Sequence, residues 1–65
     1  MLNNTPSRSM LSIGTEVKII QKQDQYTGKL TEGKVKKIFT SSKIHPHGIK
    51  VELEDGTIGR VQNIV

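Results

Sequence analysis

Apolar and charged residues alternate in two separate stretches of the chain. Residues 15–20 (TEVKII) place Val17 and Ile19 on one side, and residues 49–54 (IKVELE) repeat this pattern. A period of two is the side-chain period of a β-strand with one buried face. We therefore predict a strand in each stretch. The side chains expected to face the core are Val17, Ile19, Ile49, Val51 and Leu53.

Two further strands are predicted between and after these stretches. In residues 33–41 (GKVKKIFTS), Val35 and Ile38 are three positions apart, which breaks the alternation and indicates a bulge or a sharp bend. Asp55-Gly56 is a strong signal for a tight turn, because glycine adopts positive φ without a steric penalty. The chain then returns as residues 57–65 (TIGRVQNIV). Residues 21–33 are polar, show no helical period, and are predicted to form a long connection.

The second and the last predicted strands share a local pattern. TEGKVKKIF begins at Thr31 and TIGRVQNIV begins at Thr57, so that glycine, a basic residue, valine and isoleucine recur at the same spacing. A repeated irregularity indicates repeated geometry, here a curved strand whose glycine lets a neighbouring segment approach closely. Four to five short strands without a helix between them predict a small all-β barrel or rolled sheet, with Val35 and Val61 inside. We predict a flexible N-terminal tail over residues 1–11 and one barrel domain over residues 12–65.

The glycine, valine and isoleucine of these strands form a pattern that resembles the core of KOW and SH3-like barrels in ribosomal and transcription-elongation proteins. Three longer stretches, DQYTGKLTEGKVKKI, HPHGIKVELEDG and IGRVQNI, are similar in sequence and order to the YwbE family of small uncharacterised proteins. This resemblance extends from Gly14 to Ile64 and implies an SH3-like (KOW-like) β-barrel. The family more commonly carries a basic residue where Tyr26 stands. The KOW comparison suggests RNA as a partner, by analogy of fold.

Positive charge is concentrated in the middle of the chain. The 65 residues carry a formal net charge of +4, and the eight lysines from Lys18 to Lys50 are accompanied by only Asp24 and Glu32 in that segment. A basic surface of this kind favours a polyanionic partner, nucleic acid first. The alternative is a solvated surface that keeps a small protein soluble.

Cysteine is absent, which excludes disulfides and thiolate metal sites and favours a reducing compartment, most simply the cytoplasm. No apolar run is long enough to suggest a signal peptide or a membrane span, so we expect no membrane partner. Side chains fill the interior of so small a barrel and leave no cavity to shield a reaction. We therefore expect no enzyme activity and no cofactor, in a monomer or weak homodimer.

These observations predict a non-catalytic nucleic-acid-binding module that prefers RNA to DNA and binds mainly through basic residues on the barrel surface. The main contacts are expected from Lys34, Lys36, Lys37, Lys50 and Arg60, with Lys29 and Lys43 on adjoining loops. Base contacts are expected from the loop residues Tyr26, His45 and His47. The alternative is a protein-interaction barrel that docks a strand of a protein or ribonucleoprotein partner on an exposed edge.

His45 and His47 lie two positions apart, so in an extended chain both would face one ion. Zinc usually takes three or four protein ligands, and the chain has no third histidine and no cysteine. We expect isothermal titration calorimetry to show no tight zinc binding. A sub-micromolar zinc site that disappears in His45→Ala or His47→Ala would contradict this expectation.

Overall fold

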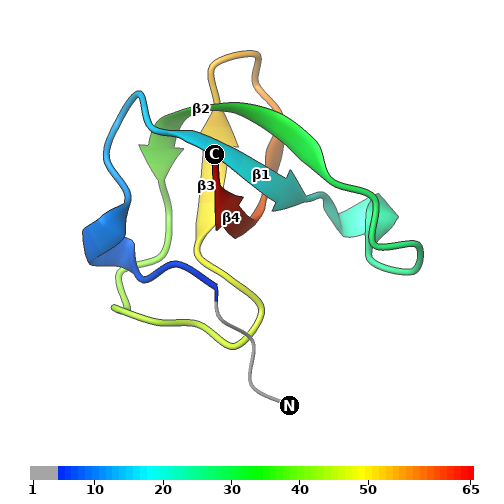
Figure 1. Cartoon of the computed structure of the whole chain (residues 1–65), viewed down its shortest axis with the longest axis horizontal. Helices are drawn as coiled ribbons and strands as arrows, with labels where there is room; N and C mark the ends of the chain where they lie inside the picture. Colours follow the sequence, from blue (N-terminus) through cyan, green and yellow to red (C-terminus); the bar gives the residue numbers. More distant parts are fainter. Residues whose placement is uncertain (1–4) are drawn as a thin grey trace.

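Four antiparallel strands form a closed barrel in the computed structural model, which describes residues 5–65 (Figure 1). The strands are β1 (Glu16–Ile20), β2 (Thr31–Ile38), β3 (Lys50–Leu53) and β4 (Ile58–Ile64), and two short 3-10 turns are η1 (Arg8–Met10) and η2 (Lys22–Asp24). Each strand pairs with its neighbours in the order β1-β2-β3-β4, and β4 pairs back onto β1. The structure confirms the predicted small all-β barrel with four strands.

The core consists of the side chains that the alternation placed on one face. All seven residues predicted to face the core are at most 1% exposed: Val17, Ile19, Val35, Ile49, Val51, Leu53 and Val61. Leu11 joins this core from the segment before β1, where no alternation marks it. Because the buried cluster of residues 5–65 contains only eight apolar side chains, each of them carries a large share of the stability.

The spacing of three in β2 and β4 corresponds to a bulge in each strand. Against β3, Val35 pairs with Leu53 and Lys37 pairs with Glu52, so Lys36 is an extra residue in β2. Against β1, Val61 pairs with Ile19 and Asn63 pairs with Lys18, so Gln62 is an extra residue in β4. Both extra residues directly follow the repeated valine. The predicted bulge is confirmed, and the sequence repeat is a repeat of this bulge.

The two repeated glycines lie where neighbouring segments approach closely. A Cβ at Gly59 would lie 2.6 Å from the carbonyl oxygen of Ile20 on β1. A Cβ at Gly33 would lie 2.7 Å from Cδ1 of Leu53 in the core. Both distances are shorter than normal van der Waals contact, so a larger residue would push β4 from β1 or displace Leu53. The predicted close approach is confirmed.

The segment before β1 is attached to the loop between β2 and β3, and Figure 1 shows the two side by side. The Arg8 backbone N–H donates to the Lys43 carbonyl at 2.7 Å, and Arg8 Nε donates to the Thr40 carbonyl at 2.8 Å. Leu11 is 6% exposed. The predicted tail covers residues 1–11, of which 1–4 lie outside the described residues. Residues 5–11 contain packed structure, so the packed part of the chain begins before the domain boundary predicted at residue 12.

Asp55-Gly56 forms the predicted turn between β3 and β4. Gly56 has φ +91°, and its N–H donates to the Leu53 carbonyl at 2.9 Å. The Thr57 N–H donates to the Asp55 carboxylate at 2.9 Å, and this hydrogen bond lowers the pKa of Asp55. Within residues 5–65 no helix is long and apolar enough to cross a membrane.

Removal of core volume should destabilise so small a barrel. We expect Val51→Ala to lower the free energy of unfolding by about 2 kcal/mol or more, because it leaves a cavity in a core built from few side chains. The matched control is Val65→Ala, since Val65 is 61% exposed and its truncation should cost far less. Urea denaturation of both variants tests this expectation, and equal losses would contradict it.

Candidate nucleic-acid interface

A groove runs along the outside of β4, between η2 on one side and β3 with its preceding loop on the other. It consists of two hollows of about 350 Å³ and about 310 Å³, which share Ile20, Gln25 and Arg60. The first hollow is completed by Lys22, Gln23, Lys50, Ile58 and Gly59, and the second by His47 and Gln62. We call these residues together the basic groove.

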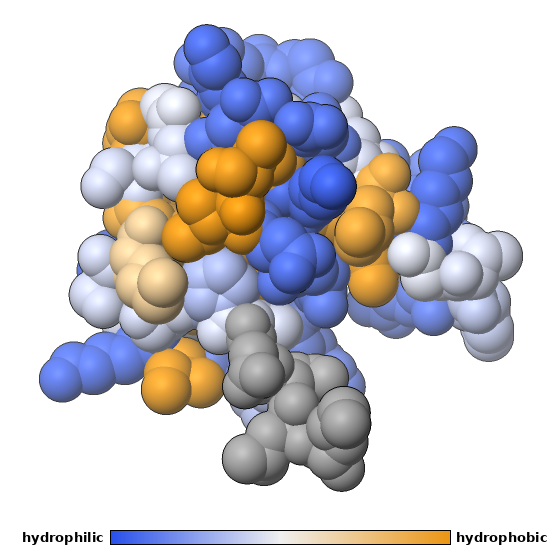
Figure 2. Space-filling view, in the orientation of Figure 1, coloured by the Kyte–Doolittle hydropathy of each residue, from blue (hydrophilic) through white to orange (hydrophobic). Residues whose placement is uncertain are grey.

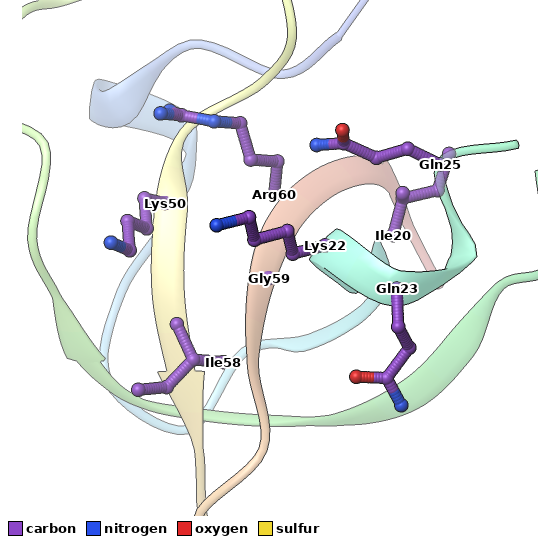
Figure 3. Close-up of a pocket in the computed structure, with 8 residues that line it drawn as sticks. All are labelled: Ile20, Lys22, Gln23, Gln25, Lys50, Ile58, Gly59 and Arg60. Carbon is purple, nitrogen blue, oxygen red and sulfur yellow. The ribbon is translucent and has the colours of Figure 1, made fainter.

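Figure 3 shows how the side chains of the first hollow are arranged. Lys22 and Gln25 reach from the η2 segment toward β3 and β4, where Lys50 and Arg60 lie. Gln23 points away from Arg60. Among the described residues, no aspartate or glutamate lines either hollow. The groove therefore presents three cations and several amide groups without a carboxylate to neutralise them, which favours an anionic ligand.

Lys50 and Arg60 lie directly opposite each other on β3 and β4. Like charges at such positions destabilise a sheet, whereas opposite charges stabilise it. The described strands pair opposite charges elsewhere, as at Glu16 with Lys34 and Lys37 with Glu52. A local arrangement that works against folding is typical of a functional site. The Lys50–Arg60 pair is therefore a feature of the groove that the energetics of strand pairing do not explain.

The guanidinium group of Arg60 is held in place by the loop before β3. Its NH1 group donates to the Gly48 carbonyl at 3.0 Å, and the side chain is half-buried. Gly48 has φ +100°, and a Cβ there would overlap the carbonyl oxygen of Val61 on β4. A glycine at this position thus lets the loop lie directly on β4. The loop then supplies the carbonyl groups that orient the side chains of the groove.

The two histidines occupy the same loop but differ in environment. The His47 backbone N–H donates to Nδ1 of His45 at 3.1 Å, and the ring centroids are 5.8 Å apart. Desolvation lowers the pKa of His45, and the neighbouring Arg60 and His47 lower it further. These effects favour the neutral form of the His45 ring. His47 lines the second hollow. Within residues 5–65, no three histidine, aspartate or glutamate side chains lie close enough together to hold a metal ion.

A basic cluster adjoins the groove at the end of β2. The ammonium groups of Lys37 and Lys50 lie 5.3 Å and 5.9 Å from the ring centroid of Phe39. Such distances are typical of cation–π contacts. Phe39 is 42% exposed. Because Lys50 also lines the first hollow, Lys37 extends the positive surface of the groove onto β2.

The other predicted site residues lie outside the groove. Lys34 is opposite Glu16, whose pKa is raised mainly by a hydrogen bond with Glu32. This outer face of β1 and β2 therefore carries both signs of charge. Seven predicted residues do not line the groove. They are Lys37, which adjoins it, and Tyr26, Lys29, Lys34, Lys36, Lys43 and His45, all of them exposed except the half-buried His45.

No residue of the η2 side of the groove was predicted from the sequence as a site residue. Lys22, Gln23 and Gln25 lie in the segment predicted as a polar connection, and Gln62 lies at the bulge of β4. A three-residue 3-10 turn has no periodic signature that would mark it. The repeat did contain a signal for Gln62, since it places Gln62 at the position of the extra residue Lys36.

The fold and the groove define a small closed β-barrel protein with a basic surface site. The chain matches the family model described as "Uncharacterized conserved protein (DUF2196)" over residues 4–64, and it belongs to this family. It is 60% identical over 62 residues to "Uncharacterized protein YwbE" of Bacillus subtilis (strain 168), with 95% of each chain covered. The predicted resemblance to the YwbE family is thereby confirmed. No solved structure matches the chain.

The close contact at Gly48 gives a test of the groove's geometry. Gly48→Ala should destabilise the protein for two reasons, the positive φ and the overlap with Val61. The matched control is Gly14→Ala, because Gly14 has a similar φ of +93° but open space around its Cβ position. We expect Gly14→Ala to cost about 1–2 kcal/mol in urea denaturation. Gly48→Ala should cost about 1 kcal/mol or more beyond that, and equal costs would show that the loop does not press on β4.

Proposed function

We propose that this protein is a non-catalytic nucleic-acid-binding module that prefers RNA to DNA and binds along the basic groove. The observation that carries this proposal is the like-charged pair of Lys50 and Arg60 at the centre of a groove lined by no carboxylate among the described residues. Two cations held opposite each other repel in the free protein. A phosphate bound beside Lys50 reduces that repulsion and releases counterions at the same time.

The number of available cations sets the expected strength of binding. Lys22, Lys50 and Arg60 line the groove, and Lys37 adjoins it. Four phosphate contacts predict that raising the salt concentration from about 50 to 200 mM weakens binding on the order of a hundredfold. The glutamine amides of the groove support RNA over DNA, because they offer donors and acceptors for a 2′-hydroxyl group. The resemblance to KOW barrels supports the same preference, as an analogy of fold.

Strand docking of a protein partner, the alternative drawn from the sequence, has less support. Every strand of the barrel already pairs with a neighbour on both sides, so no strand offers a wholly free edge among the described residues. We place the RNA-binding activity in the cytoplasm, in keeping with a chain that contains no cysteine.

A pair of charge-matched variants tests the groove. Lys22→Gln with Lys50→Gln removes two cations from the groove, and Lys18→Gln with Lys34→Gln removes two from the mixed-charge face of β1 and β2. Both variants lower the formal net charge from +4 to +2. In filter binding to a short single-stranded RNA, we expect the groove variant to lose about tenfold or more in affinity. The slope of its log affinity against log salt concentration should decrease by about two phosphate contacts. The control should bind nearly as wild type does.

Thermal unfolding at low salt provides the complementary measurement. The groove variant should melt no lower than wild type, because it removes the repulsion between Lys50 and Arg60. The control should melt lower, because it removes the attraction of Lys18 and Lys34 for Glu32 and Glu16. Equal losses of affinity in both variants would show that net charge alone drives binding. Wild-type affinity no tighter than that of an unrelated protein of equal charge would refute the proposed function.

A further inference from the structure

The second hollow of the groove contains a hydrogen-bond acceptor whose direction is fixed. Gln62 is the extra residue of the β4 bulge, and its side chain is half-buried. Its Nε2 group donates to the His47 carbonyl at 3.0 Å and to the Arg60 carbonyl at 3.2 Å. These bonds use both amide hydrogens. The amide oxygen Oε1 accepts no hydrogen bond from any described residue, and it is left as the acceptor of the hollow.

Arg60 supplies hydrogen-bond donors to the same hollow. One of its N–H groups is taken by the Gly48 carbonyl, which fixes the plane of the guanidinium group. A guanidinium has five such donors, so several remain for a ligand. Arg60 and Gln62 both line the second hollow. A donor group and an acceptor group therefore line the same hollow, each held by hydrogen bonds to backbone carbonyls, before any ligand arrives.

This pairing distinguishes the second hollow from the first. A phosphate accepts hydrogen bonds only, so the Gln62 oxygen would repel it, whereas Lys22 and Lys50 in the first hollow suit a phosphate well. A ligand of the second hollow must donate and accept at neighbouring atoms. The hydrogen-bonding edge of a nucleobase does so.

The size and the walls of the second hollow also fit a single base. Its volume of about 310 Å³ is at the lower end of the range for small-molecule sites. Ile20 contributes an apolar surface and His47 a planar ring that is able to stack on a base. A base within a duplex has its edge occupied by its partner, so only an unpaired base presents that edge.

We propose that the second hollow binds one unpaired base of the RNA, read by Arg60 and Gln62, while the adjacent phosphate lies between Lys22 and Lys50. This inference rests on the proposed function and specifies its ligand as single-stranded. Because the two hollows share Arg60 and Gln25, one nucleotide extends across both. The phosphate contact supplies affinity for any sequence, and the base contact supplies a preference for unpaired bases.

Probes of equal charge separate the two contacts. The first probe is a short ribose-phosphate chain without bases. The other four carry a single adenine, cytosine, guanine or uracil at the centre of the same chain. In fluorescence anisotropy, we expect at least one base to raise wild-type affinity about tenfold over the chain without bases. A duplex RNA with the same number of phosphates should bind no better than the chain without bases.

Three variants assign the contacts. Gln62→Ala should abolish the gain from the base and leave the affinity for the chain without bases and its salt dependence unchanged. Gln23→Ala is the matched control, because Gln23 lines only the first hollow and points away from Arg60, and it should keep the gain. The double variant Lys22→Gln with Lys50→Gln should weaken all probes by the same factor.

The outcomes separate the two proposals. If wild type binds the chain without bases in a salt-dependent way and no base improves binding, the base site is refuted while the proposed function stands. Duplex binding as tight as that of the best single-base probe would also refute the base site alone. Because these comparisons use wild-type protein, they hold even where Gln62→Ala fails to fold. If wild type binds none of the probes, both proposals are refuted.

Discussion

A sheet of only four strands closes into a barrel only if its strands bend sharply. The chain meets this constraint with one extra residue in each of two strands, Lys36 in β2 and Gln62 in β4. Glycines at 33 and 59 lie two positions before the buried valines of the same strands and allow the close packing that follows from the bend. Since the buried cluster holds so few side chains, closure is what brings them all into contact. The core and the surface site both depend on these two bulges.

The bulge in β4 connects the fold to the candidate site. An extra residue in a strand is left out of the regular pairing and its side chain is aimed differently. In β4 this residue is Gln62, which the loop before β3 orients through the His47 carbonyl. Gly48 allows that loop to lie on β4, and its own carbonyl holds Arg60. The bulge in β4 that allows the barrel to close therefore also places Gln62 in one wall of the groove.

Charge is separated over the surface in a way that the net value of +4 does not reveal. On β1 and β2, lysines lie opposite glutamates and their fields largely cancel. On β3 and β4, Lys50 lies opposite Arg60, and η2 adds Lys22. Figure 2 shows hydrophobic residues only as separate patches among hydrophilic ones on the face that it displays. The asymmetry that distinguishes the groove is therefore one of charge and of oriented amide groups.

The sequence was sufficient to predict the strands and most of the core because the signals for them are local. Alternation identified the inward-facing residues of the strands, Asp55-Gly56 marked the turn, and the spacing from Val35 to Ile38 revealed a bulge. Each of these patterns reflects a rule that acts within a few residues. Leu11 escaped prediction because its burial depends on a distant part of the chain rather than on its neighbours in sequence.

The candidate site was harder to predict from the sequence than the strands were, because closure of the barrel determines which surface residues become neighbours. The basic residues predicted from the sequence include Lys50 and Arg60, which the pairing of β3 and β4 places together. They also include Lys34, which the pairing of β1 and β2 places opposite Glu16. Lys22 reaches the groove only because η2 lies beside β4 once β4 has paired with β1. The spacing of charges along a chain carries no information on which strands become neighbours. That information arises when the hydrophobic faces close on one another and bring distant segments to a common surface.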